Sequence, residues 1–162
     1  MRLSSWSLAG LLALAGCSSY APPAELAGMT RDQVVARMGA PDTQQQRDGG
    51  TRLEYPHGPF GKHTWFVYLD SAGIATRAEQ VLTEANFNRV TPGMDQDAVR
   101  NLLGRPGETY MLGRSRGMVW SYRYESALCQ WFQVEISDAH QVRSAGYGTP
   151  PECERRDRII FP

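Results

Sequence analysis

The sequence has few of the side chains that ordinarily carry catalysis or bind metals. It contains three histidines and three cysteines in 162 residues. No serine lies in a nucleophile-elbow motif. The stretch GMDQDAV, residues 93–99, lacks the alternating oxygen ligands and the distal glutamate of a calcium loop. We therefore expect a non-catalytic protein that needs no cofactor.

An excess of charge of either sign is also missing, as is a long apolar run. Seventeen basic side chains balance 17 acidic ones, so the formal net charge is zero. Nucleic-acid binding normally needs a basic surface, so we expect no nucleic-acid partner. A hydrophobic content of 41% is sufficient for a folded core, and the length favours one domain or two very small ones.

The N-terminus has the pattern of a signal peptide. The apolar run Trp6–Ala15 is much shorter than the ~20 residues that cross a bilayer. It ends in Leu14-Ala15-Gly16-Cys17, which resembles the bacterial lipobox. The resemblance implies cleavage after residues 1–16 and acylation of the Cys17 thiol. Because Ser18 follows instead of aspartate, it also implies a periplasm-facing position at the outer membrane. The alternatives are an ordinary secretory signal or an uncleaved anchor.

The segment after the lipobox predicts a short tether. Residues 17–24 contain Pro22-Pro23. Consecutive prolines favour an extended polyproline conformation of about 3.1 Å per residue. We therefore expect the folded body to lie close to the bilayer that holds the acyl chains.

Two cysteines remain once Cys17 is assigned to the lipid. In an oxidising compartment, Cys129 and Cys153 are most simply interpreted as a disulfide. Such a bridge would contribute about 3 kcal/mol to stability in the chain-entropy model. A reactive thiol is the alternative.

One short pattern occurs twice in the chain, as GMTRDQVVARMGAP at 28–41 and as GMDQDAVRNLLGRP at 93–106. In the first copy Thr30 and Gln33 form a capping box, and Gly39 ends the helix. In the second copy Asp95 is the N-cap and Gly104 ends the helix. Each copy predicts a short helix that needs a sheet to pack against.

Alternating strands follow each predicted helix. Residues 118–124, for example, place Met118, Trp120, Tyr122 and Tyr124 on one face. The dipeptides Trp65-Phe66 and Trp131-Phe132 extend the repeat through the strands. A further helix is predicted within residues 82–90, with a weaker remnant at 25–27. We predict an α+β fold of two tandem repeats, 25–81 and 82–153, each with two short helices and a three- or four-stranded antiparallel sheet.

The helix motif, the strands and the lipobox together resemble the BamE (SmpA/OmlA) outer-membrane lipoproteins over residues 25–148. That family serves the machine that inserts β-barrels into the outer membrane. The doubled unit is also similar to β-lactamase inhibitor protein, in which a concave sheet grips an enzyme. A typical BamE has one such unit and this chain has two. The resemblance implies outer-membrane assembly subunits, or another envelope protein, as partners.

Two loops are candidate contact sites. The loop PHGPFGKH is either a solvated turn, a metal site or a partner-contact loop, and its candidate residues are His57, Phe60, Lys62 and His63. The GRSRG turn, 113–117, is either a plain hairpin tip or a phosphate contact through Arg114 and Arg116.

Two functions from different classes fit the sequence. The first is a non-catalytic lipoprotein that assembles or stabilises outer-membrane β-barrels. The alternative is a lipid-anchored module that binds or inhibits a periplasmic enzyme. The C-terminal tail, 154–162, ends in an apolar stretch that either frays, adds an edge strand or contacts a partner.

Overall fold

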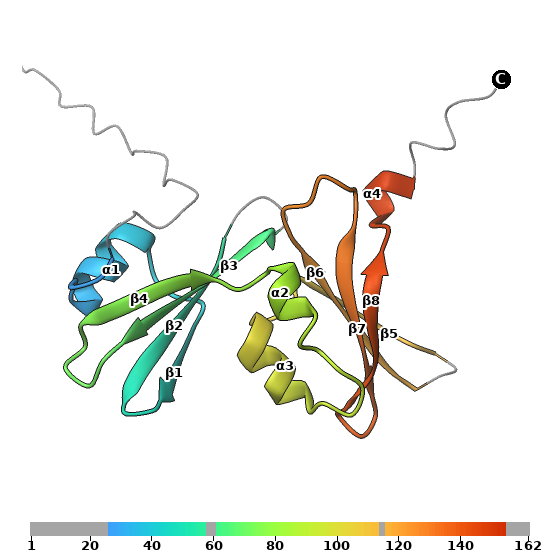
Figure 1. Ribbon diagram of the computed structural model, residues 1–162, viewed down its shortest axis with the longest axis horizontal. Helices are drawn as coiled ribbons and strands as arrows, with labels where there is room; N and C mark the ends of the chain where they lie inside the picture. Colours follow the sequence, from blue (N-terminus) through green and yellow to red (C-terminus); the bar gives the residue numbers. More distant parts are fainter. Residues whose placement is uncertain (1–25, 58–60, 114–115, 155–162) are drawn as a thin grey trace, which may run out of the picture.

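A computed structural model describes residues 26–57, 61–113 and 116–154 (Figure 1). It confirms the α+β class and contains two four-stranded antiparallel sheets, each in sequential strand order. The first sheet and its helix comprise α1 (Arg31–Met38), β1 (Thr43–Arg47), β2 (Gly50–His57), β3 (His63–Leu69) and β4 (Ala75–Gln80). The elements that follow are α2 (Glu84–Phe87), α3 (Gln96–Leu103), β5 (Glu108–Met111), β6 (Gly117–Arg123), β7 (Trp131–Ser137), β8 (Val142–Gly148) and α4 (Pro151–Glu154). Within the described ranges, no helix is long and apolar enough to cross a membrane.

The two repeated helices begin and end where their capping residues predict. The Thr30 hydroxyl accepts from the Gln33 backbone N–H at 3.3 Å, and the Gln33 side chain accepts from the Thr30 N–H at 2.8 Å. The Asp95 carboxylate accepts from the Asp97 N–H at 2.7 Å. Gly39 and Gly104 end the helices with φ of 85° and 79°. These signals are local, which is why the sequence alone locates them.

The additional helix is present before the second repeated helix, whereas the residues described before the first, from residue 26 onward, form no helix. Thr83 caps α2, and Phe87 at its end is buried. Of the predicted remnant at 25–27, residue 25 lies outside the described ranges, and residues 26–27 belong to a turn. The Met29 N–H donates to the Leu26 carbonyl at 3.1 Å in this turn, and Gly28 has φ of 85°. The positive φ of Gly28 is not helical, so residues 26–28 do not continue as a helix into α1.

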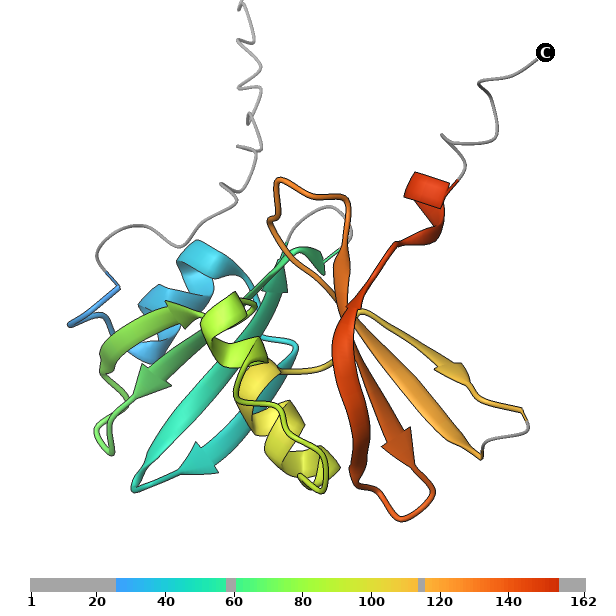
Figure 2. The same cartoon turned by 45° about the vertical axis from the view of Figure 1, so that its right-hand side comes forward.

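The helices and sheets stack in the order α1, first sheet, α2 with α3, second sheet (Figures 1 and 2). The core under α1 contains Leu26, Val34, Leu53, Tyr55, Val67, Leu69 and Ala75. The core of α2, α3 and the second sheet contains Phe66, Val81, Leu82, Phe87, Val90, Val99, Leu103, Trp120, Tyr122, Tyr124, Phe132, Val134, Ile136 and Val142. Because Phe66 belongs to β3, the first sheet contributes to the core of the second.

Polar side chains of the first sheet also hold α3. Arg52 Nη1 donates to the Asn101 carbonyl at 2.9 Å, and the Arg105 N–H donates to Glu54 Oε1 at 2.8 Å. Both Arg52 and Glu54 are buried, at 4% and 3% exposed. Helix α3 is therefore shared by the two sheets, which makes the repeats one packed body.

The register of the repeat differs from the one that the Trp-Phe dipeptides predict. On β2 and β3, Tyr55 pairs with Trp65, whereas on β6 and β7, Tyr122 pairs with Phe132. Trp65 is thus equivalent to Phe132 and not to Trp131. Since a one-residue slip moves a side chain to the opposite face, Trp65 faces α1 whereas Trp131 faces away from α3.

Candidate partner-binding face

One face of the second sheet has no described helix over its middle. Helices α2 and α3 lie on the opposite side of this sheet (Figure 2). We call this surface the outer face. Its side chains come from alternate positions on paired strands: Glu108, Tyr110, Val119, Ser121, Arg123, Trp131, Gln133, Glu135 and Ser144. The first sheet differs, because α1 and α3 cover its two faces.

The outer face presents one exposed aromatic ring, and the polar side chains near it hydrogen-bond to one another. Tyr110 is 49% exposed and lies opposite Val119 on the neighbouring strand. Gln133 donates to the Ser121 hydroxyl at 3.1 Å, and the Ser144 hydroxyl donates to Glu135 at 3.2 Å. An exposed aromatic side chain on a rigid sheet is a frequent anchor of protein–protein contacts.

Arg123 closes one end of the outer face. Its Nε and Nη2 donate to Glu108 at 3.0 and 2.6 Å, and its Nη1 donates to Glu152 of α4. The guanidinium also lies over the Trp131 ring, 5.0 Å from its centre, and Trp131 is buried. Burial alone would lower the pKa of Arg123, but the hydrogen bonds to Glu108 and Glu152 raise it, so the side chain stays charged.

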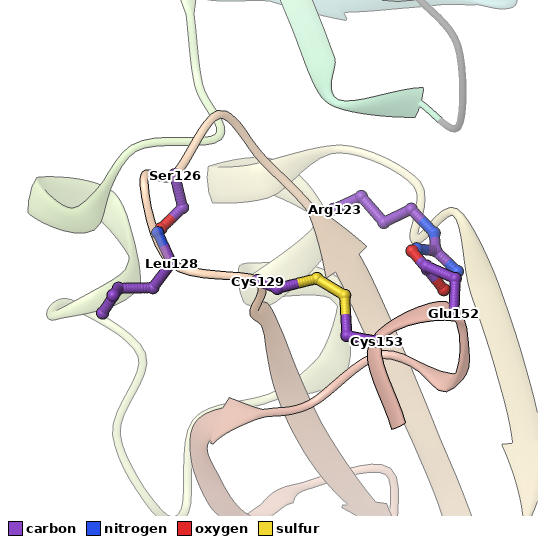
Figure 3. The surroundings of a disulfide bond; sticks show 6 residues. All are labelled: Arg123, Ser126, Leu128, Cys129, Glu152 and Cys153. Carbon is purple, nitrogen blue, oxygen red and sulfur yellow. A yellow bond between two sulfur atoms is a disulfide. The ribbon is translucent and has the colours of Figure 1, made fainter. Parts of the chain in front are cut away.

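A disulfide fastens α4 next to this arginine. Cys129 and Cys153 are bonded, with Cα atoms 6.3 Å apart, and Glu152 points back toward Arg123 (Figure 3). A pocket of about 430 Å³ lies beside the bridge. Its lining includes Leu128, which is 67% exposed. The disulfide and the ion pair together hold the last helix against the sheet.

Acid should release α4 from Arg123. Burial would raise the pKa of Glu152, but its own backbone N–H and Arg123 hold it below its ordinary value near 4.5. The stability from this contact is therefore present above that value and is lost as the pH falls through the lower folded pKa. Replacing Arg123 with glutamine should raise the pKa of Glu152 in a carboxyl NMR titration. Arg143→Gln, which instead removes a partner of Glu135, should leave it unchanged. An unaltered Glu152 titration in Arg123→Gln would contradict the assignment.

Removing the disulfide should destabilise the protein by about 3 kcal/mol, because a sequence separation of 24 closes a sizeable loop. The double variant Cys129→Ser/Cys153→Ser tests this by urea unfolding. Reductant should lower the stability of the parent by the same amount and leave the double variant unaffected. If both thiols of the non-reduced parent react with a labelling reagent, the bridge is not formed.

The structure brings one of the predicted loop residues to the disulfide pocket. Lys62 lines this pocket together with Cys129 and Cys153. The backbone of His57 pairs with that of His63 at the end of β2 and β3. Phe60 lies outside the described residues. Among the described residues no group of three or more His, Cys, Asp or Glu side chains could hold a metal.

The other predicted contacts stay predictions. Cys17 and Arg114 lie outside the described residues. Arg116 has φ of 44°, and its carbonyl accepts from Arg143 at 3.1 Å, which places it in the β5–β6 turn. The outer face itself was not among the predicted site residues. The alternation of Val119, Ser121 and Arg123 indicates a second face, but only the position of α3 shows that no described helix lies over its middle. Val119 and Ser121 are nevertheless buried, at 7% and 1% exposed.

Comparisons with known proteins give weak likenesses. No protein-family model matches the chain, and no curated protein matches it. A solved structure assigned as the osmotically inducible lipoprotein OsmE is similar at 26% identity, over 47% of this chain and 81% of its own, with a TM-score of 0.37. A structure assigned as a β-lactamase inhibitor protein from Streptococcus mutans is similar at 14% identity, over 75% of this chain and 83% of its own, with a TM-score of 0.33. At these TM-scores the likenesses support no inference about function, and membership of the BamE family stays a prediction.

Proposed function

We propose that the protein is a lipid-anchored, non-catalytic subunit at the periplasmic side of the outer membrane. Its task is to support the assembly or stability of outer-membrane β-barrel proteins. It does so by holding a protein partner on the outer face of its second sheet. The lipobox at Cys17 and the resemblance of the doubled helix motif to BamE proteins support the location and the process.

The observation that carries the proposal is the difference between the two sheets. In the first sheet, Arg52 and Glu54 hold α3 over the face that points away from α1. The equivalent positions on the second sheet are Val119 and Ser121. A helix packed in the way of α3 would therefore find neither a guanidinium donor nor a carboxylate acceptor at these positions. Because Val119 and Ser121 are themselves buried, a partner of another kind would contact this face through the exposed ring of Tyr110.

Affinity purification from detergent-solubilised membranes, followed by mass spectrometry, tests this function. The parent should co-purify with barrel-assembly subunits at near-stoichiometric yield. Tyr110→Arg should weaken the complex by about 30-fold or more, because aromatic hot spots contribute about 2 kcal/mol or more. Met111→Arg is the matched control, since Met111 is the next residue of the same strand, is 70% exposed and faces the other side.

Two outcomes would overturn parts of the proposal. If a periplasmic enzyme dominates the purified material and barrel-assembly subunits are absent, the protein is a binding or inhibitory module. If Tyr110→Arg and Met111→Arg retain the partner equally, the outer face is not the contact surface.

A further inference from the structure

A second site lies on the first sheet, away from the outer face. The turns that join β1 to β2 and β3 to β4 border a pocket of about 620 Å³. Arg47, Arg52 and Arg77 line it, together with the hydroxyl-bearing residues Ser71 and Thr76. Three guanidinium groups at one pocket are notable in a chain with no net charge.

Within the described part of the chain, the hydrogen-bond acceptors of two of these arginines are neutral. Arg47 and Arg52 both donate to Gln45 Oε1, at 3.3 and 3.0 Å. Both also donate to Asn101, Arg47 to the side-chain oxygen and Arg52 to the backbone carbonyl. Neither forms an ion pair with a carboxylate of the described chain, whereas Arg77 pairs with Glu79 at 2.6 Å. Two adjacent positive charges thus share two neutral groups.

Arg52 is the more constrained of the pair. It is 4% exposed, its guanidinium lies 4.0 Å from the centre of the Phe66 ring, and its Nε has no hydrogen-bond partner in the described structure. Burial, followed by the charge of Arg47, lowers the pKa of Arg52, and Tyr68 and the carboxylate of Glu54 offset only part of this effect. A buried guanidinium with an unpaired donor is costly unless an anion compensates it.

Helix packing explains part of this arrangement but not all of it. Arg52 binds a carbonyl near the C-terminal end of α3, where a cation is favoured. Helix packing gives the Nε of Arg52 no hydrogen-bond partner, and it gives Arg47 no carboxylate partner among the described residues. In the second sheet, Leu112 and Val119 occupy the positions equivalent to these two arginines, and Gly117 is equivalent to Gly50. The strand pairing of the unit therefore does not require the arginines, although Arg52 also holds α3 on the first sheet.

We propose that Arg47 and Arg52 bind a carboxylate group of a peptide or protein ligand in this pocket. Guanidinium groups match a carboxylate through paired N–H donors. A carboxylate carries a single negative charge. Asp48 and Asp70 also line the pocket and would repel a doubly charged phosphate more strongly. The volume exceeds that of one carboxylate, so the rest of the ligand occupies the space toward Ser71 and Thr76.

Amide NMR titration of the full-length protein, purified as the cell processes it, tests the site. The probes are N-acetylalanine for a terminal carboxylate, the α-amide of N-acetylaspartate for a side-chain carboxylate, and inorganic phosphate. We expect at least one carboxylate to shift the amides of Gly49 and Gly50 saturably. The carboxylate that binds more tightly identifies the source. Arg47→Gln should weaken binding about tenfold or more, because a charge-assisted hydrogen bond is lost.

The controls separate binding from folding. Arg105→Gln removes an exposed arginine that pairs with Asp42 outside the pocket, and it should bind as the parent does. Arg47 is only half-buried, so Arg47→Gln should fold even if Arg52→Gln does not. Equal binding by Arg47→Gln and the parent, no response to either carboxylate, or a response to phosphate alone would each overturn the proposal.

Discussion

Replacing Gly104 with alanine should lower the free energy of unfolding by about 3–5 kcal/mol, whereas the same change at Gly39 should cost about 1–3 kcal/mol. The two glycines end equivalent helices. Their φ and ψ are 85° and −175° at Gly39, and 79° and −167° at Gly104, a region that is almost restricted to glycine. The backbone cost of the substitution is therefore the same at both positions.

The difference comes from the shared position of α3. A Cβ at Gly104 would lie 2.7 Å from Glu54 Oε1 and 2.9 Å from Thr64 Cγ2, whereas a Cβ at Gly39 meets nothing within 4 Å. Glu54 cannot move without losing its hydrogen bond from Arg105, and both Glu54 and Thr64 are buried. Urea unfolding of both variants measures the difference. Equal losses of stability would show that α3 does not press against the first sheet.

Replacing Trp120 with alanine should cost about 3–5 kcal/mol, the usual range for a buried tryptophan. Trp120 is 1% exposed and belongs to the core that α3, β3 and the second sheet share. Because that core includes Phe66 of the first sheet, both sheets of the variant should unfold in one transition. The midpoint of this transition should lie at a lower denaturant concentration than that of the parent.

Leu53→Ala is the matched variant for this experiment. Leu53 occupies the position equivalent to Trp120 in the first repeat, is fully buried and packs under α1. This substitution should lower the free energy of unfolding by about 2–5 kcal/mol and should also preserve a single unfolding transition. Tryptophan fluorescence and far-ultraviolet circular dichroism should coincide for both variants. Two separate transitions in either variant would contradict a shared core.

Local signals in the sequence predict much of the secondary structure. Thr30, Asp95 and Thr83 cap their helices with their own side chains, and Gly39 and Gly104 end two of them, so a short window of sequence contains the information. The faces of β6 are likewise predictable, because Trp120 and Tyr122 alternate with smaller or polar residues. The Trp-Phe dipeptides mislead, because identical letters one residue out of register point to opposite sides of the sheet.

The order of the layers is not predictable in this way. Nothing near Arg52 or Glu54 in the sequence indicates that α3, which follows much later in the chain, would lie over them. The candidate site depends on that order, since the outer face is defined by the absence of a helix among the described elements. The pairing of Arg47 with Arg52 around Gln45 and Asn101 is hidden for the same reason.

Site-specific photocrosslinking in living cells tests the proposed function most directly. A photoreactive phenylalanine analogue would replace Tyr110 on the outer face in one strain and Met111 on the opposite side in another. We predict a discrete adduct with one envelope protein from position 110, identified by mass spectrometry as a barrel-assembly subunit, and none from position 111. Adducts of equal yield from both positions, or none from position 110, would contradict a partner bound to the outer face.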